Sequence, residues 1–333
     1  MMLYRAEPNA LMIFNSDTGY TAAISDRELA ILKTWLQSEQ ANGFIERLQE
    51  LTLLPKLMSK AEKAQLLSIV DETAKACAPL RSFTAPESLH IDLTTACPLA
   101  CVQCYKEPSE VILPMDKFTN IIAEAKAMKV FQIALGGGEP LLLDNLAEYI
   151  KVVHNAQMAC TLTSSGYQLT KERVVELQAA GINHIQISLN GSTQEIHTSS
   201  RDGYQEARQA LTVLAQSKVL FGINWVARRD NIADFTNMIS LAKALRAEHL
   251  NILRYKPAIH EEYEKISLSF ADFYGLAASI KKVQGLKLKL DSAFSPLLCY
   301  LYGTNFAAAN CGCGAGRRVR QAKGTSYSGW EPR

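Results

Sequence analysis

Three cysteines close together in the chain have the spacing of metal ligands. Cys97, Cys101 and Cys104 stand four and three residues apart, directly after the apolar, strand-like run at residues 89–93. A 4Fe–4S cluster prefers four thiolates, and no fourth cysteine lies in this segment. One iron would therefore stay open to another ligand, as in catalytic rather than closed metal sites. From the cysteines alone, a zinc site or a chance cluster is the alternative.

A glycine-rich turn follows one βα unit later, with the sequence Gly136, Gly137, Gly138, Glu139. Glycines allow a ligand to approach the backbone closely, although such a run by itself is most often only a turn. Together the two motifs resemble the radical S-adenosylmethionine (SAM) superfamily. This resemblance implies that SAM chelates the open iron through its amino and carboxylate groups, and that the glycine turn contacts the SAM amino group. The combination disfavours the zinc alternative.

From residue 88 onward, strand-like runs alternate with helical patterns. Strands are expected at residues 88–94, 130–136, 159–165, 184–190, 220–227 and 249–256, and helices near 116–129, 144–156, 170–180, 204–216, 231–246 and 270–283. This alternation implies a parallel sheet with right-handed crossovers. Six such units match the incomplete (β/α)6 TIM-like barrel of radical SAM enzymes, an α/β fold expected over residues 86–290. In such barrels the chemistry lies at the C-terminal ends of the strands.

The third and fourth expected strands end in residues that match positions of the family. Ser164 lies in a turn similar to the family's Thr-Asn-Gly turn. Ser188 and Arg201 lie in a stretch that resembles one common in peptide-modifying members. By that match they would hold the SAM carboxylate, which suits the planar fork of arginine. Asn190 stands where the family usually has aspartate, so its part in substrate or ribose binding is open, and His197 either joins the site or is an ordinary residue at a helix start.

Gln103 departs further from the family pattern, because the residue before the third cysteine is usually aromatic and packs on adenine. The amide of Gln103 could hydrogen-bond the base instead, and Tyr105 is available for packing. At the end of the sixth expected strand, Arg254 and Lys256 either meet a substrate carboxylate or lie in solvent.

Residues 1–55 form a separate unit in the sequence. Two short strands are expected at residues 10–15 and 19–25, and Ser25 caps a helix with Glu28 three residues later. A small hairpin with helices ahead of a radical SAM core resembles the PqqD-like peptide-recognition domain. The resemblance implies that a leader peptide binds as an added strand at the sheet edge; a structural cap on the barrel is the alternative. Residues 56–85 are expected to be a helical linker.

The C-terminal segment, residues 291–333, contains Cys299, Cys311 and Cys313. This cysteine pattern resembles the start of a SPASM or twitch extension, which holds auxiliary Fe–S clusters in that family. Gly329 stands where the next cysteine is expected, so the extension is truncated or divergent. The three thiols would hold one auxiliary cluster, or they are structural cysteines.

The composition limits the classes of function. Of 333 residues, 48% are hydrophobic and 20% are charged, which supports a packed core rather than disorder. A net charge of +2 gives no sign of a surface for nucleic acid or anionic membranes. The chain starts without a charged-then-apolar leader, and it has no apolar run of the ~20 residues that span a membrane. A cytoplasmic protein is expected.

The resemblance implies a radical SAM enzyme that reductively cleaves SAM and uses the 5′-deoxyadenosyl radical to modify a ribosomally made precursor peptide. Cross-linking, epimerisation and backbone excision are all open as outcomes. The expected partners are the precursor peptide, an electron donor such as flavodoxin or ferredoxin, and a separate recognition protein. A small-molecule radical SAM enzyme and a catalytically inert, peptide-recruiting homologue are the alternatives.

Overall fold

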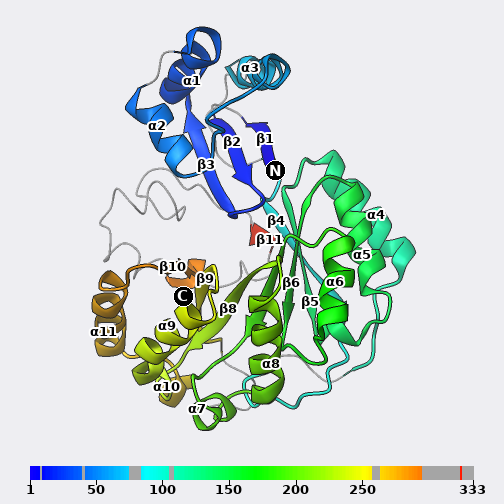
Figure 1. Cartoon of the computed structure of the whole chain (residues 1–333), viewed down its shortest axis with the longest axis vertical. Helices are drawn as coiled ribbons and strands as arrows, with labels where there is room; N and C mark the ends of the chain where they lie inside the picture. The colour runs from blue at the N-terminus through cyan, green and yellow to red at the C-terminus, as the bar shows by residue number, and fades with distance from the viewer. Residues whose placement is uncertain are drawn as a thin grey trace, which may run out of the picture.

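The computed structural model describes residues 1–7, 10–39, 42–74, 84–104, 109–256, 263–294 and 323–324. A small N-terminal unit lies at one end of a larger, barrel-like α/β unit (Figure 1). Within the described ranges, none of the helices combines the length and the apolar character needed to cross a bilayer.

The N-terminal unit is a three-stranded antiparallel sheet with helices. The strands, in the order β1-β2-β3, are β1 (Met2–Glu7), β2 (Ala10–Asn15) and β3 (Tyr20–Ser25), and the helices are α1 (Asp26–Ser38), α2 (Gly43–Glu50) and α3 (Lys60–Ala74). The sequence predicted β2, β3 and the helix start at Ser25, where the backbone N–H donates to Glu28 Oε2 at 2.9 Å. It missed β1, because Arg5 and Glu7 break the apolar pattern although both side chains are buried.

The sheet of the N-terminal unit is covered on both faces. Leu11, Ile13 and Ile24 pack with residues of α1, α2 and α3 in one core, so α3, which falls in the segment expected to link the units, belongs to this core. On the other face Met12 and Phe14 pack on the barrel unit, and the rings of Phe14 and Phe131 stack with centroids 5.6 Å apart. Strand β2 is consequently buried along its whole length.

The larger unit is built on a parallel sheet in sequential strand order, as predicted. The strands are β4 (Ser88–Thr94), β5 (Gln132–Gly137), β6 (Ala159–Ser164), β7 (His184–Ser188), β8 (Leu220–Ala227), β9 (His249–Arg254) and β10 (Lys287–Leu290). The short strand β11 (Lys323–Gly324) pairs in parallel with β4. The six expected strands are confirmed, and β10 is an addition that the sequence did not reveal, because it is only four residues long and alternates lysine with leucine.

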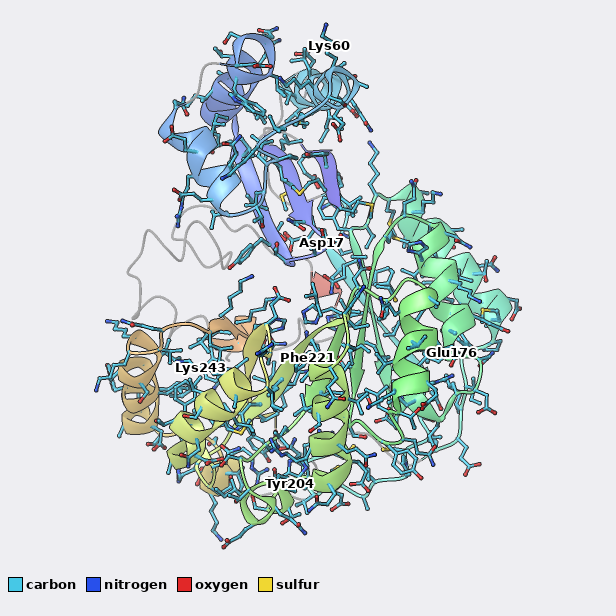
Figure 2. All side chains as sticks on the ribbon, in the orientation of Figure 1. Asp17, Lys60, Glu176, Tyr204, Phe221 and Lys243 are labelled. Atoms are coloured by element: carbon cyan, nitrogen blue, oxygen red, sulfur yellow. The ribbon has the colours of Figure 1, made fainter. Side chains whose placement is uncertain are left out.

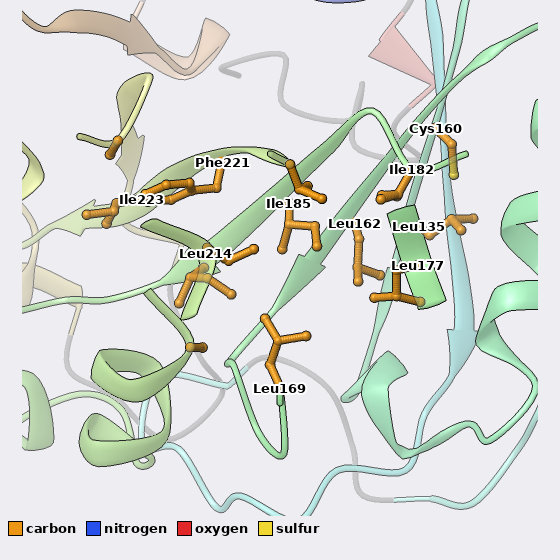
Figure 3. Close-up of a cluster of buried hydrophobic side chains, with 14 of the residues drawn as sticks. Leu135, Cys160, Leu162, Leu169, Leu177, Ile182, Ile185, Leu214, Phe221 and Ile223 are labelled. Carbon is orange, nitrogen blue, oxygen red and sulfur yellow. The ribbon is translucent and has the colours of Figure 1, made fainter. Parts of the chain in front are cut away.

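Helices cover the outside of this sheet (Figure 1). They are α4 (Met115–Ala127), α5 (Leu146–Asn155), α6 (Lys171–Ala179), α7 (Gln194–Thr198), α8 (Tyr204–Ala215), α9 (Phe235–Ala244), α10 (Tyr263–Ile266) and α11 (Phe270–Lys281). Alternate strand residues, such as Leu162 and Ile185, point toward the helices and meet side chains such as Leu177 and Leu214 (Figure 3). Because side chains alternate across a strand, the other face of the sheet carries the intervening residues. On β7 these are polar, and the concave face of the barrel is therefore suited to a polar ligand.

Candidate cofactor site at the carboxyl ends of the strands

The three cysteines lie in the loop that follows β4. None of the three cysteines is in a disulfide in the described structure, Cys97 and Cys104 are exposed and Cys101 is half-buried, and the N–H of Cys104 donates to the carbonyl of Cys101 at 3.0 Å. Burial raises the pKa of the Cys97 thiol, the N–H of Leu99 opposes this, and the nearby charges of Glu139, Cys101 and Cys104 raise it further. A cation bound to these sulfur atoms would have the opposite effect and lower the pKa of the thiols, because it stabilises thiolates.

The three sulfur atoms are not gathered into a compact ligand group. In the part of the chain that the structure describes, one group of His, Cys, Asp and Glu has its ligand atoms all within 4.8 Å, and it does not include these cysteines. The set of ligands is nevertheless the one that a 4Fe–4S cluster with one open iron would use, namely three thiols without a fourth nearby in the sequence.

The glycine turn after β5 packs directly against the cysteine loop. Gly138 N donates to the carbonyl of Thr94 at 2.7 Å, and Glu139 N donates to that of Ala96 at 2.8 Å. A Cβ on Gly137, whose φ is +132°, would lie 2.2 Å from Thr94 O, and one on Gly138 would lie 2.1 Å from Ala96 O. These glycines are thus required for two segments of the chain to meet, which fixes the start of the cysteine loop.

Glu139 connects this turn to the end of β6. Its carboxylate is fully buried, and Oε1 accepts hydrogen bonds from Leu141 N at 3.0 Å and Ser164 Oγ at 2.8 Å. Its other oxygen accepts from the N–H of Ser165 at 2.7 Å and from the Ser165 hydroxyl. Both oxygens are used inside the protein, so Glu139 and Ser164 position the strand ends. Ser165 was not singled out in the sequence, although a pair of serines at a strand end is the signal that could have found it.

Gln103 and Asn190, two departures from the family pattern, are hydrogen-bonded to each other. Asn190 is fully buried and its Nδ2 donates to Gln103 Oε1 at 2.9 Å and to Ser200 Oγ at 2.8 Å. Its Oδ1 accepts from Val226 N at 3.1 Å. Because aspartate has no N–H to donate, an aspartate at position 190 could not donate to the side-chain carbonyl of Gln103 as Asn190 does. Asn190 therefore joins the cysteine loop to β7 and β8.

Arg201 carries a polar atom that no described residue satisfies. Its Nε is buried and has no hydrogen-bond partner within the described structure. Such a donor is costly unless a ligand accepts from it. A carboxylate is the natural partner of a guanidinium, so the unpartnered N–H fits the predicted SAM carboxylate. Ser188 is buried at the end of β7.

His197 is held between the same segments. The ring is buried, its Nδ1 accepts from Asn190 N at 3.1 Å, and its Nε2 donates to the carbonyl of Asp202 at 3.1 Å. Burial lowers the pKa of His197, the hydrogen bond to Asp202 opposes this, and the charge of Arg201 adds to the lowering. The neutral ring therefore has a positioning role, as an ordinary hydrogen-bonded residue near a helix.

Other predicted residues lie elsewhere. Arg254 donates to the carbonyl of Ala293 at 3.2 Å and lies over the ring of Phe273, which ties the end of β9 to the following segment. Four residues predicted from the sequence lie outside the described residues, namely Tyr105, Cys299, Cys311 and Cys313.

Residues 91–242 match the radical SAM superfamily. The chain is 32% identical over 185 residues to the PqqA peptide cyclase of Ruegeria pomeroyi, and 28% identical over 188 residues to that of Rhizobium meliloti. These alignments cover 53% and 54% of this chain and 49% of each relative, so the chain spans about half the length of the curated relatives it matches.

Solved structures share the fold. Streptococcus suis SuiB bound to S-adenosylmethionine matches with a TM-score of 0.65 and 14% identity over 90% of this chain and 73% of that one. SuiB bound to its precursor peptide SuiA matches with a TM-score of 0.62. Native anSMEcpe with bound AdoMet matches with a TM-score of 0.52 and 18% identity, over 65% and 66% of the two chains. A radical SAM core implies a 4Fe–4S cluster and SAM as cofactors, and residues 91–242 of this chain match the model of that superfamily.

Proposed function

We propose that this chain is a radical SAM enzyme that modifies a ribosomally made precursor peptide. The observation that carries the proposal is the buried Nε of Arg201, which has no hydrogen-bond partner among the described residues, beside the loop that contains the three cysteines. The loop is connected to Arg201 through protein contacts, since Gln103 N donates to Ser200 O at 3.2 Å and Asp202 N donates to Cys101 Sγ at 3.4 Å. Similarity to PqqA peptide cyclases supports a peptide substrate.

Each site residue has a distinct role in this proposal. Cys97, Cys101 and Cys104 would hold the cluster, and Arg201 with Ser188 would bind the SAM carboxylate. The backbone of Gly136, Gly137 and Gly138 would face the SAM amino group, while Gln103 and Tyr105 would contact the adenine. When bound, the reduced cluster supplies the electron that cleaves SAM to a radical able to abstract hydrogen from the substrate. The protein orients the two groups and excludes water from them.

The N-terminal sheet is the proposed site for the leader of the peptide. Strands β1 and β3 each pair with β2 alone in the described structure, so each has an unpaired edge. Strand β3 is less buried than β2. An extended leader could add to the free edge of β3 through main-chain hydrogen bonds. The face of the sheet that carries Phe14 packs on the barrel unit through Phe131. The edge of β3 is therefore the place where the leader could bind as an additional strand.

The position of this sheet sets a length requirement on the peptide. The sheet contacts the segments that precede β4 and β5, at Ala85, Pro86, Lys129 and Phe131, whereas the cysteines follow the other end of β4. Asp17 in the β2–β3 turn and Tyr204 at the start of α8 mark these opposite ends (Figure 2). The eight residues of β8 span about 26 Å. A leader bound to β3 therefore needs a spacer of at least about eight extended residues before the modified residue.

The proposal is tested by anaerobic reconstitution with iron and sulfide, followed by SAM, a reductant and the peptide encoded beside the gene. We expect 5′-deoxyadenosine and a mass change in the peptide, and neither in the Cys97→Ala, Cys101→Ala, Cys104→Ala triple variant. Thr21→Pro or Ala23→Pro should weaken leader binding, because proline cannot donate to an added strand and distorts the existing one, while Ala23→Val should not. Absence of deoxyadenosine would indicate an inert homologue. Deoxyadenosine with an unmodified peptide would indicate a small-molecule enzyme.

An auxiliary cluster on Cys299, Cys311 and Cys313 is a separate part of the proposal. Its support is the resemblance of this cysteine pattern to a SPASM or twitch extension. Reconstituted protein should then contain more than the ~four irons of one cluster, and replacing these three cysteines with serine should remove the excess. An iron content that stays near four in both proteins would show that these cysteines are structural.

A further inference from the structure

A second cluster of metal-ligating side chains lies at the opposite end of the barrel from the cysteines. His184 and His249 are the first residues of β7 and β9, and Glu248 directly precedes β9. One ligand atom from each residue lies within 4.8 Å of the other two. His184 Nε2 is 2.6 Å from Glu248 Oε2, and the two imidazole rings have centroids 4.8 Å apart.

One nitrogen of this cluster has no partner. His249 is fully buried, and its Nδ1 makes no hydrogen bond in the described structure, the carboxylate oxygen of Glu248 being 3.9 Å away. The other nitrogens of both rings meet a single amide, with Gln186 Nε2 at 2.8 Å from His184 Nδ1 and 2.9 Å from His249 Nε2. An amide nitrogen donates, so both rings accept there and carry their protons on His184 Nε2 and His249 Nδ1. The second of these protons points at no acceptor.

Gln186 is placed to hydrogen-bond to both histidines on the side that faces away from a bound metal. A histidine that binds a metal donates its other N–H to a carbonyl or carboxylate. Rotating the Gln186 amide by half a turn presents its oxygen to both rings, and that rotation exchanges two atoms that are nearly indistinguishable in shape. Asn251 Nδ2 now donates to Gln186 Oε1 at 3.3 Å and to Asn224 Oδ1 at 2.6 Å, so the amides of Asn251 and Asn224 rotate with that of Gln186. Both rings would then donate to one oxygen, which frees His184 Nε2 and His249 Nδ1 for a cation.

The neighbouring strand leaves room for this network. A Cβ on Gly222 of β8 would lie 2.6 Å from Gln186 Oε1 and 2.6 Å from His249 Nε2. A side chain at this position would displace the amide and the ring, so glycine between the two histidine strands is a requirement of the cluster.

Two lysines face the cluster, and the electrostatic balance still permits a cation. Lys287 Nζ donates to Glu248 Oε1 at 3.1 Å, which leaves Oε2 toward the histidines. Burial lowers the pKa of Lys289, and the charge of Glu248 opposes this. Burial, with the charges of Lys289 and His184, lowers the pKa of His249 to about 2, so the ring is neutral as a metal ligand must be.

We propose that His184 Nε2, His249 Nδ1 and Glu248 Oε2 bind one divalent transition-metal ion, with zinc the ion that two imidazoles and one carboxylate suit best. The ion ties the N-terminal ends of β7 and β9 together. It also holds Glu248 against Lys287, whose ammonium lies 5.2 Å from the ring centroid of Tyr20 on β3. The site is thus a structural tie beneath the N-terminal sheet and is separate from the cofactor site.

The test uses the full chain with Cys97, Cys101, Cys104, Cys299, Cys311 and Cys313 replaced by serine, so that no thiolate from either cysteine group competes for metal. Titration with Co²⁺ should give one equivalent of visible d–d absorption without a thiolate-to-cobalt band, and Zn²⁺ should displace it. His249→Ala should abolish this binding, while His154→Ala, which removes an exposed histidine, should leave it unchanged.

A second pair of variants keeps the test decisive if His249→Ala does not fold. Gln186→Met removes the outer acceptor and should weaken binding by about 10–100-fold. Gln186→Glu supplies an acceptor in either orientation of its side chain. This variant should bind Co²⁺ at least as tightly as the six-serine protein without the substitution, which is the parent in this test. Absence of binding by the parent, or binding that none of these substitutions changes, would overturn the proposal. Since this protein lacks the cluster ligands, the result is independent of the proposed enzymatic function.

Discussion

Two arginines, one at each end of the barrel, have buried guanidinium nitrogens in opposite surroundings. Arg5 donates to Glu7 Oε1 at 2.6 Å and also to the carbonyls of Ala85, Pro86 and Lys129. Arg201, at the cysteine end, has a buried Nε that meets nothing in the described structure. Arg5 thus makes a structural contact, in which the protein satisfies its own donors, whereas the donor of Arg201 is the one that we propose binds a ligand.

The same difference extends to the segments around each arginine. At the N-terminal end, the stacked rings of Phe14 and Phe131 and the Arg5 contacts close the junction between the two units. At the cysteine end, Glu139 and Asn190 fix the surrounding loops while the thiols remain exposed or half-buried. Removing the whole N-terminal unit would uncover the first of these junctions, so point substitutions are the sharper way to test each end.

The largest expected effect is on stability, from Arg5→Met. This substitution leaves the buried carboxylate of Glu7 without its guanidinium partner, and breaking a buried ion pair in this way costs about 3–5 kcal/mol. Urea unfolding measures the loss. Arg47→Ala removes the exposed pair with Glu50 and should cost less than about 1 kcal/mol. Equal losses in the two variants would contradict the structural role of Arg5.

Arg201→Ala should produce the reverse result, with weaker SAM binding and unchanged stability. A hydrogen bond to a charged group contributes roughly 1.5–3 kcal/mol, so SAM affinity should fall about tenfold or more. Iron content should stay constant, because the thiols are untouched. Arg201→Lys retains the charge but loses the fork, and should recover only part of the affinity. Unchanged SAM affinity of the alanine variant by anaerobic equilibrium dialysis would reject the carboxylate role.

The sequence predicted most of the barrel and the position of the candidate site, but it did not predict the side-chain contacts that distinguish the two ends of the barrel. The alternation of apolar runs predicted the six barrel strands, and the cysteine and glycine motifs predicted which strand ends carry the site. Strand β1 was missed because Arg5 and Glu7 look like surface residues until their pairing is known. The Gln103–Asn190 and His184–Glu248 contacts join residues 87 and 64 positions apart, and no local periodicity encodes such contacts.

Acidification should weaken the cysteine end through His197. Its pKa is lowered in the folded protein, chiefly by burial, so below the ordinary value of about 6.5 the unfolded chain binds a proton that the folded chain does not. Stability should therefore fall as the pH drops from about 6.5 toward the lowered pKa, by at most about 1.4 kcal/mol per pH unit. Unfolding measured from pH 7.5 to 5 should show a shallower slope for His197→Gln than for the parent. Identical slopes would exclude this titration.

The smallest expected effect is the coupling between Gln103 and Asn190. Asn190→Asp removes the N–H that now donates to Gln103 Oε1 at 2.9 Å, so the Gln103 amide must rotate and donate its own N–H, or two acceptors face each other and repel. Gln103→Phe removes that carbonyl, so Asn190→Asp should be less harmful to SAM affinity and to stability in the Gln103→Phe background. A double-mutant cycle should give a coupling of about 1 kcal/mol. The same cycle with Gln168, an exposed glutamine, serves as the control and should give none. If the effects of Gln103→Phe and Asn190→Asp are additive, the two substitutions are independent, and the hydrogen bond does not link the cysteine loop to β7.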